Sequence, residues 1–554
     1  MTSTGSASER YTVGDVVAEF LASCGVGHAF GVISIHNMPI LDAFARHGRI
    51  RFVGSRGEAG AVNMADAAAR VGGGLGVAVT STGTAAGNAC GSMVEAQTAG
   101  TPVLHITGQI ERDYLDRNRG YIHEARDQLA MLRAVSKAAF RVWSPETALG
   151  TLREAVRVAL TSPAGPVSVE IPIDVQEAEI DRPADLGPPP IEALAPSTAA
   201  IDALAEALTS ARRPMLWLGG GARHAGAEVR RLIDLGFGVV TSVQGRGVVA
   251  EGHPMSLGSY NLQPPVEAFY ATCDAMVVAG SRLRGNETLK YTLRLPSPLF
   301  GIDADPMAEN RAYPLDRFVT GDSALALGAL ADRLAGRMKT DPTFADDLNR
   351  ARVKAETGMR ETLGPYEAIL DALLRTVPDD LVWVRDITLS NSMWGNRLPR
   401  LQGPRDGVHA LGGGIGQGIA MAVGAALESG GRKTVALSGD GGFYVSLGEL
   451  ATAVQERVDV AFVVMNDKGY GVIRNIQDAK FGGRRHYADL HMPEFADLSR
   501  TMGLPYYRVA EAGEMAPALE AALAVDGPAL VEVDMTAIGP FARPFAGPPV
   551  RKAD

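Results

Sequence analysis

The sequence of 554 residues predicts an α/β protein with three domains, each built on a parallel sheet. Its length corresponds to about three domains at roughly 100–200 residues each. Short apolar runs rich in β-branched residues also alternate with helical patterns, as expected for strands buried on both faces of parallel sheets. These predicted strands occupy residues 74–82, 102–109, 165–174, 215–221, 275–281, 381–387, 433–440 and 460–467.

Two stretches separate the predicted domains. The stretch 179–197 is rich in proline, and the stretch of about 337–366 is polar with a helical pattern. Both interrupt the alternation of strands and helices, which is typical of connections between domains. The expected domains therefore cover residues 1–185, 195–345 and 360–554.

Composition excludes several classes of function. The net charge of -10 argues against nucleic-acid binding, which needs a basic face. The chain contains no run of about 18 uninterrupted apolar residues, so no membrane span is expected. Its three cysteines form no CxxC pair, which argues against a zinc site or a disulfide framework. The polar N-terminus has no apolar signal core, and the expected location is the cytoplasm.

An acidic, glycine-rich turn follows the predicted strand at 433–438. A second cluster ends the next strand and contains Asp467 and Gly469. Ligands of open α/β sheets bind at the carboxyl ends of strands, and glycines let backbone N–H groups approach a diphosphate. Mg²⁺ prefers oxygen ligands from one or two carboxylates. The residues expected to bind are Gly439, Asp440, Gly441 and Gly442 in the turn, with Asp440, Asp467 and the carbonyl of Gly469 as metal ligands.

A Gly-Asp-Gly sequence alone is also a common turn. However, the whole stretch 438–471, with its E-L-x-T-A segment at 449–453, resembles the thiamine-diphosphate motif of the acetolactate synthase and pyruvate decarboxylase superfamily. This resemblance implies thiamine diphosphate (ThDP) and Mg²⁺ as cofactors, and the three-domain fold with pyrimidine-binding, central Rossmann-like and diphosphate-binding domains. Asp467 departs from the pattern, because many members have Asn there. Both side chains offer an oxygen, but Asp adds a negative charge.

Two further segments of the third part are similar to family segments that contact the cofactor. In LSNSMWG (389–395) the match implies that Ser390 and Asn391 contact the diphosphate, although a helix N-cap is the alternative interpretation. In HALGGGIGQG (409–418) it implies that Gly413 and Ile415 lie against ThDP, with Ile415 holding the cofactor bent. The alternative for Ile415 is a residue of the core.

Glu58 is the candidate for activating the cofactor. It lies in RGEAGA (56–61), which resembles the family's R-H-E-x-x-A pattern with Gly57 in place of His. The resemblance implies that Glu58 bonds to the pyrimidine ring, although a glutamate at a helix start is also favourable on electrostatic grounds alone. In the family the pyrimidine and diphosphate domains of one site come from different chains. We therefore expect a homodimer or a homotetramer with active sites between chains.

The central part, at 213–229 and 299–306, resembles the family's central domain, which holds FAD in acetolactate synthases. The pattern that contacts FAD is not found, and FAD is not predicted. A triple glycine alone is weak evidence for a nucleotide.

Three polar residues, His36, Asn37 and His123, mark the expected substrate side and are the candidate catalytic residues there. His36 and Asn37 stand where acetolactate synthases have a Pro-Gly-Gly turn, and His123 stands where they have Gln. In these features the chain is closest to the guanidino-oxopentanoate decarboxylase-like branch. A histidine can donate a proton at neutral pH, which favours 2-oxo acid decarboxylation with possible carboligation. Lone histidines are more often satisfied polar residues, and His28 and His105, inside predicted strands, are expected to be structural.

Three other functions remain open. The chain could be an acetolactate synthase that joins two pyruvates, although His123 and the missing FAD pattern weaken that interpretation. It could be a lyase of the 2-hydroxyacyl-CoA type. A non-catalytic scaffold is the third alternative, against which Glu58, Asp440 and Asp467 argue.

Overall fold

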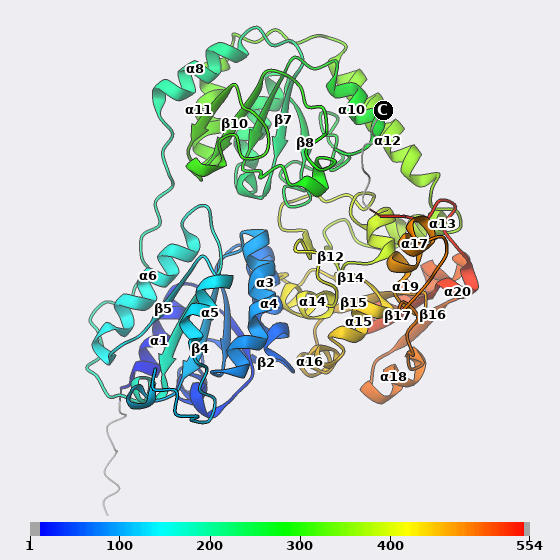
Figure 1. Ribbon diagram of the computed structural model, residues 1–554. Coiled ribbons are helices and arrows are strands. Elements are labelled where there is room, and N and C mark those ends of the chain that lie inside the picture. Colours follow the sequence, from blue (N-terminus) through cyan, green and yellow to red (C-terminus); the bar gives the residue numbers. More distant parts are fainter. Residues whose placement is uncertain (1–10, 548–554) are drawn as a thin grey trace, which may run out of the picture. The chain divides into compact units, whose positions relative to one another are not determined.

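The computed structural model describes residues 11–547 and contains three parallel sheets, which confirms the predicted α/β fold class (Figure 1). The chain divides into two compact units, and each is described by itself. The first unit runs to Ile191 and adds Val423–Glu428 and Ser446–Glu456 from the third domain. The second unit holds the rest of the central and third domains. The predicted domain boundaries stay predictions.

The first sheet, drawn in blue and cyan in Figure 1, has the order β2-β1-β3-β4-β6-β5. Its central strands are buried along their whole length, which explains their apolar sequences. The strands are β1 (His28–Gly31), β2 (Arg51–Gly54), β3 (Gly76–Thr80), β4 (Val103–Gln109), β5 (Ala138–Arg141) and β6 (Val167–Pro172). The helices are α1 (Val13–Ser23), α2 (Met38–His47), α3 (Glu58–Gly72), α4 (Thr84–Ala99), α5 (Gln128–Val135), α6 (Ala148–Leu160) and α7 (Ile173–Gln176).

The central sheet, green in Figure 1, has the order β11-β10-β9-β7-β8. Its strands are β7 (Pro214–Leu218), β8 (Gly238–Thr241), β9 (Ala275–Ala279), β10 (Leu299–Asp303) and β11 (Arg317–Thr320). The helices of this domain are α8 (Thr198–Leu208), α9 (Gly226–Asp234), α10 (Pro264–Tyr270) and α11 (Ser323–Leu334). Apolar side chains of α8, α9 and α11 form one core with this sheet.

The third sheet has the order β13-β12-β14-β15-β17-β16. Its strands are β12 (Val382–Arg385), β13 (Gly407–His409), β14 (Thr434–Gly439), β15 (Val460–Asn466), β16 (Tyr506–Val509) and β17 (Ala529–Asp534). The helices are α13 (Tyr366–Thr376), α14 (Gly418–Leu427), α15 (Asp440–Val445), α16 (Gly448–Glu456), α17 (Gly471–Lys480), α18 (Phe495–Met502), α19 (Met515–Leu523) and α20 (Met535–Ile538). By its contacts, α16 belongs to the first unit.

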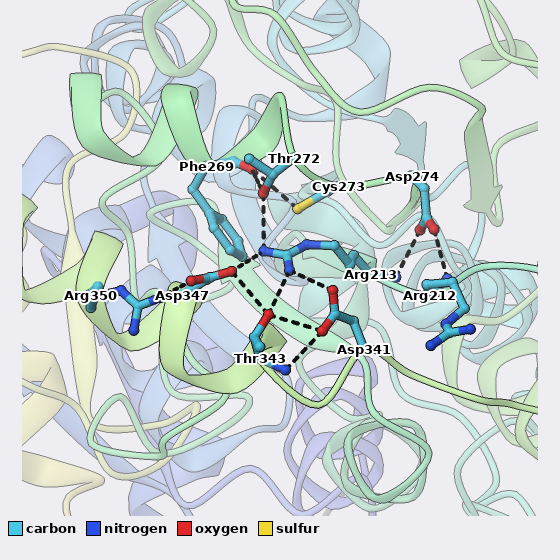
Figure 2. Close-up of polar contacts among 10 residues, drawn as sticks. All are labelled: Arg212, Arg213, Phe269, Thr272, Cys273, Asp274, Asp341, Thr343, Asp347 and Arg350. Carbon is cyan, nitrogen blue, oxygen red and sulfur yellow. Dashed lines mark hydrogen bonds and ion pairs between the residues drawn. The ribbon is translucent and has the colours of Figure 1, made fainter.

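The polar stretch before the third domain is anchored rather than free. It forms α12 (Phe344–Arg360), and Figure 2 shows how Arg213, next to β7, holds its beginning. The guanidinium of Arg213 donates to Asp341 at 3.0 Å and to Asp347 at 2.7 Å. It also lies 5.2 Å from the ring centroid of Phe344, whose side chain is buried. Ion pairs and a cation–π contact therefore fix this helix against the central domain.

Within residues 11–547, no helix is both long and apolar enough to cross a membrane. The strand positions predicted from apolar runs are confirmed, including those of His28 in β1 and His105 in β4. His105 is fully buried, and its two ring nitrogens lie 2.8 Å from the Thr80 hydroxyl and 3.2 Å from the Ser168 hydroxyl. Burial lowers the pKa of His105 to about 4.

This burial makes the first domain sensitive to acid. Because the folded-state pKa lies below the unfolded value, protons favour unfolding, and stability is lost as the pH falls from about 6.5 to about 4. The size of this effect is about 3 kcal/mol. We expect the melting temperature of wild type to fall more steeply than that of His105→Gln across this range. The exposed His486→Gln variant is the control, and equal slopes for wild type and His105→Gln would contradict the prediction.

Candidate active site

The first group of predicted residues lies where the strand order of the first sheet reverses. The chain passes from β1 to β2 on one side and then to β3 on the other. At such a reversal the loops leaving the two strands separate, which leaves room for a ligand at their carboxyl ends. The short 3₁₀-helix η1 (Ile35–Asn37) follows β1, and Gly83 follows β3. His36 and Asn37 therefore lie at a favourable place for a ligand.

The structure brings His36 and His123 together. Their ring centroids are 5.2 Å apart, with the rings 75° from parallel. Two glycines permit this approach, because a Cβ at Gly108 would collide with the carbonyl oxygen of His36, and one at Gly83 with that of His123. His123 itself has a φ of 65°, an uncommon conformation for a residue other than glycine. The two histidine loops are thus held close by the backbone.

The two histidines differ in environment. His36 is only 5% exposed, and its Nδ1 atom is buried without a hydrogen-bond partner. Burial, followed by the charge of His123, lowers the pKa of His36. His36 is therefore neutral at neutral pH, whereas His123 faces solvent. An unpartnered buried nitrogen is costly and indicates a place that a bound molecule can satisfy.

Asn37 is fully engaged by its own turn. Its side chain is completely buried, its Nδ2 donates to the carbonyl of Val32 at 2.9 Å, and its Oδ1 accepts from the N–H of Ser34 at 2.8 Å. These bonds fix the turn that presents His36. The geometry therefore favours a positioning role for Asn37 over the direct catalytic role that the sequence suggested.

A buried polar network that sequence reasoning missed supports the same loops. Gln128 accepts from the hydroxyl of Thr82 at 2.9 Å and from the N–H of Gly83 at 2.7 Å. It donates to the carbonyl of Gly108 at 3.2 Å and to Glu170 at 3.0 Å. Gln128 therefore ties together the two glycine positions that the histidines approach. The only sequence signal was Glu170, a charged residue inside an otherwise apolar strand.

Glu58 is the first residue of α3 and is half-buried. Its Oε2 accepts a hydrogen bond from Asn88 of α4 at 3.1 Å. A second carboxylate, Glu449 of α16, accepts from the N–H of Arg56 at 3.1 Å, and a Cβ at Gly60 would collide with it. The small residues near Glu58 thus make room for Glu449. Both carboxylates lie at the N-terminus of α3, which favours negative charge.

A second group of predicted residues surrounds the corresponding reversal in the third sheet, between β12 and β14. Asp440 begins α15 directly after β14, and Asp467 directly follows the neighbouring β15. Asp440 is 1% exposed and accepts from the N–H of Gly469 at 2.8 Å. Burial and the charge of Asp467 raise the pKa of Asp440, and burial raises that of Asp467. Two carboxylates in this environment favour a cation between them.

Arg474 compensates part of the extra charge that Asp467 brings. Its guanidinium lies 3.0 Å from the Asp467 carboxylate and donates to the Asp467 carbonyl at 2.6 Å. The departure from Asn at this position is therefore matched by a cation of the same chain. In the described part of the chain, no group of three or more His, Cys, Asp or Glu side chains could hold a metal. A metal at this place needs the Gly469 carbonyl and oxygens of the cofactor in addition.

The surroundings of these carboxylates fit a diphosphate. The hydroxyl of Ser390 and the Oδ1 of Asn391 are buried without a partner. Ser390 stands at the N-cap position of a π-helix, η7 (Asn391–Gly395), but its side chain makes no capping hydrogen bond, which leaves its hydroxyl available to a ligand. A Cβ at Gly441 would lie 2.7 Å from the Tyr470 ring. The N–H groups in the first turn of a helix have no backbone partner within it, which suits an anion.

Ile415 lies in the loop before α14 and is 37% exposed, which contradicts the alternative that it is a core residue. Gly413 and Gly416 on either side have φ values of 85° and 83°. These glycines let the loop turn sharply, so that a bulky apolar side chain faces away from the core. Such an exposed side chain suits contact with an apolar part of a ligand.

Comparison with known proteins decides the family. Three models of thiamine pyrophosphate enzymes match: the N-terminal TPP-binding domain at residues 11–131, the central domain at 201–330 and the C-terminal TPP-binding domain at 390–533. A probable 2-ketoarginine decarboxylase of Pseudomonas aeruginosa is 30% identical over 530 residues, which is 94% of each chain. The chain belongs to the thiamine pyrophosphate enzyme family. It is therefore a ThDP-dependent enzyme.

Other relatives of this thiamine pyrophosphate enzyme carry different names. The acetolactate synthase large subunit of Corynebacterium glutamicum is 26% identical over 552 residues, covering 95% of this chain and 87% of the relative. A putative thiamine pyrophosphate-containing protein of Bacillus subtilis is 27% identical over 540 residues, covering 94% and 91%. The predicted family and cofactor are confirmed, while the roles of the individual site residues stay predictions.

The acidic pair provides a direct test of cofactor binding. We expect Asp440→Ala to weaken ThDP binding in the presence of Mg²⁺ by about tenfold or more, because one charged ligand is lost. Asp467→Asn is the matched variant, and it should change the affinity only a few-fold, since the amide keeps an oxygen at the same place. Titration calorimetry measures both. Wild-type affinity in Asp440→Ala would show that the metal site lies elsewhere.

Proposed function

We propose that this enzyme removes carbon dioxide from a 2-oxo acid and protonates the product, with carboligation to an added aldehyde as a minor outcome. The paired histidines carry this proposal, because His123 stands where acetolactate synthases have Gln and lies 5.2 Å from His36. Bound ThDP supplies the electron sink that makes decarboxylation possible. The side chains of this protein hold the cofactor, orient the substrate and deliver the proton.

The proposed cofactor contacts follow from the second group of residues. Asp440, Asp467 and the Gly469 carbonyl would hold Mg²⁺, which would bind the diphosphate. The N–H groups of Gly441 and Gly442, with Gly439 giving access, and the side chains of Ser390 and Asn391 would complete that contact. Ile415 and the backbone at Gly413 would lie against the rings of ThDP. Glu58 would hold a proton against the pyrimidine ring, with Asn88 orienting its carboxylate at 3.1 Å.

Proton delivery is assigned to His123. The neutral His36 is a poor acid, since burial lowers its pKa, but its unpartnered Nδ1 can orient a substrate group. His123 is exposed and can exchange protons with solvent. An amide at the same position can form hydrogen bonds but cannot donate a proton of this kind. This difference supports a decarboxylase over an acetolactate synthase.

The carboxylate of Glu111 places a negative charge near His36, on the side where the substrate is expected. Glu111 follows β4, and its charge acts on His36. One carboxylate oxygen of Glu111 accepts from the Tyr121 hydroxyl at 3.2 Å, while the other is buried without a partner. Tyr121 also stacks on Tyr114 at 4.6 Å between ring centroids. A carboxylate beside stacked aromatic rings suits a cationic, planar group, and one relative bears the name of a 2-ketoarginine decarboxylase.

A panel of 2-oxo acids tests this function. We expect release of carbon dioxide with ThDP and Mg²⁺, and the highest kcat/KM for 5-guanidino-2-oxopentanoate. Its neutral ureido analogue of similar shape is the control for the cationic end, and pyruvate is the control for acetolactate formation. Formation of acetolactate without free aldehyde would favour the synthase, and activity only with a 2-hydroxyacyl-CoA would favour the lyase. The absence of turnover with every 2-oxo acid would contradict the proposal.

The His123→Gln variant separates the two chemical steps. We expect it to slow release of the aldehyde by about 10²-fold or more, because general acid catalysis is lost, while loss of carbon dioxide in a single turnover changes less. The product ratio should shift towards carboligation when an acceptor aldehyde is added. His36→Gln is the matched variant, and we expect its main effect on KM. Unchanged rates and product ratios in His123→Gln would exclude its role as the acid.

We also propose a homodimer or homotetramer in which Glu58 of one chain serves the diphosphate site of another. Glu58→Ala should bind ThDP but lose most turnover, and Asp440→Ala should lose ThDP. Co-expression with two affinity tags allows hybrid dimers to be isolated. If sites form between chains, each hybrid dimer contains one intact site and should have about half of the wild-type activity. Inactive hybrids would indicate that each site forms within one chain.

A further inference from the structure

Asp386 is a buried carboxylate that the predicted site did not include. It directly follows β12 and is 1% exposed. Its Oδ1 accepts from the N–H of Ile387 at 2.7 Å, and its Oδ2 accepts from the N–H of Gly416 at 3.0 Å. The N–H groups of Gln417 and Gly418 also hydrogen-bond to it. Asp386 thus accepts hydrogen bonds from backbone N–H groups of the loop that carries Ile415 and of the start of α14.

The same carboxylate also lies close to the start of α15, the segment proposed to bind the diphosphate. A Cβ at Gly442 would lie 2.9 Å from Oδ2 of Asp386, and one at Gly418 would lie 2.8 Å from the Asp386 Cβ. Three segments therefore meet at Asp386: the end of β12, the loop before α14 and the start of α15. They meet where the strand order of the sheet reverses.

This arrangement is unfavourable for stability alone. Burial raises the pKa of Asp386 to about 6, and the interactions that oppose this rise come from backbone N–H groups. A buried carboxylate costs free energy that hydrogen bonds only partly offset. A neutral residue would avoid this cost, but only an ionised carboxylate accepts from several N–H groups without presenting a donor of its own. The need to hold the loop that carries Ile415 therefore explains why a charged residue stands at position 386.

We propose that Asp386 is a positioning residue that holds the Ile415 loop against the start of α15 and thereby sets the affinity for ThDP. The inference rests on the proposed cofactor contacts of Ile415 and Gly442. In this role Asp386 does not touch the reacting atoms. It fixes the separation between the segment that receives the diphosphate and the segment that lies against the rings.

The Asp386→Asn variant tests this role. It keeps the shape and one oxygen but turns an NH₂ group towards N–H donors. We expect titration calorimetry with Mg²⁺ to show ThDP affinity lowered by about tenfold or more. The KM for ThDP should rise similarly, while kcat at saturating ThDP stays within about threefold. The melting temperature without cofactor should be unchanged or higher, because a buried charge is removed.

Asp322→Asn is the matched control. Asp322 is also buried after a strand, and its Oδ1 accepts from the N–H groups of Ala324 at 2.9 Å and Leu325 at 3.1 Å, but in the central domain. Because His224 lies 2.7 Å from the Asp322 carboxylate and helps to lower its pKa, we expect loss of this charge to lower the melting temperature without changing ThDP affinity. Asp386→Glu is a second variant that keeps the charge but lengthens the side chain, and it should also weaken ThDP binding.

Two results would overturn the inference. One is wild-type ThDP affinity in both Asp386 variants, and the other is a parallel loss of affinity and of cofactor-free melting temperature, as expected for a purely structural residue. ThDP binding is measured without substrate, so failure of the decarboxylase proposal can be distinguished from failure of the inference about Asp386. In that case the wild type would turn over no 2-oxo acid while the affinity difference at Asp386 persisted.

Discussion

The approach of two carboxylates at neighbouring strand ends is the constraint on which the third domain depends. Asp440 and Asp467 are close enough for the charge of one to raise the pKa of the other. A nearby cation lowers the cost of keeping both carboxylates ionised, and the chain supplies part of that charge through Arg474, 3.0 Å from Asp467. A divalent cation bound to a diphosphate would supply the remainder. The glycines at 439, 441 and 442 let Thr388, Tyr470 and Asp386 pack closely against this segment.

In the first unit, the site residues are positioned by the space that two glycines leave beside the backbone, whereas in the third domain charge has this role. Gly83 and Gly108 leave room for the carbonyls of His123 and His36, and Gln128 connects the two glycine segments. A side chain at either glycine would separate the histidines, whatever their own identity. The close approach of the two rings therefore depends on residues that have no catalytic group. This approach distinguishes the chain from a protein with an amide side chain at position 123.

The sequence predicted the fold class and the strands because buried parallel strands have continuous apolar runs. It also pointed to the acidic residues after β14 and β15, since that motif is local, although the structure starts helix α15 at Asp440 where a turn was expected. It could not predict the role of Asn37, whose side chain completes its own turn, or the contact of Glu449 with the N–H of Arg56, which joins residues 393 positions apart. Asp386 was missed because a single Asp after a strand has no local pattern, and its partners lie some 30 residues away. Sequence motifs and periodicity do not predict long-range hydrogen bonds between side chains and the backbone.

Buried acidic groups recur near the carboxyl ends of strands in both units, and their roles differ with their partners. Asp440 and Asp467 lie close together, so a bound cation would stabilise the ionised form of both carboxylates. Asp386 and Glu449 instead accept backbone N–H groups, so their charge organises a loop or a helix start. In a cofactor site both kinds are needed, because a metal ligand is useful only if the segments around it are held in register. The hydrogen bonds of Asp386 and Glu449 hold the backbone around the proposed contacts through groups of the protein itself, and such preorganisation reduces the ordering that binding requires.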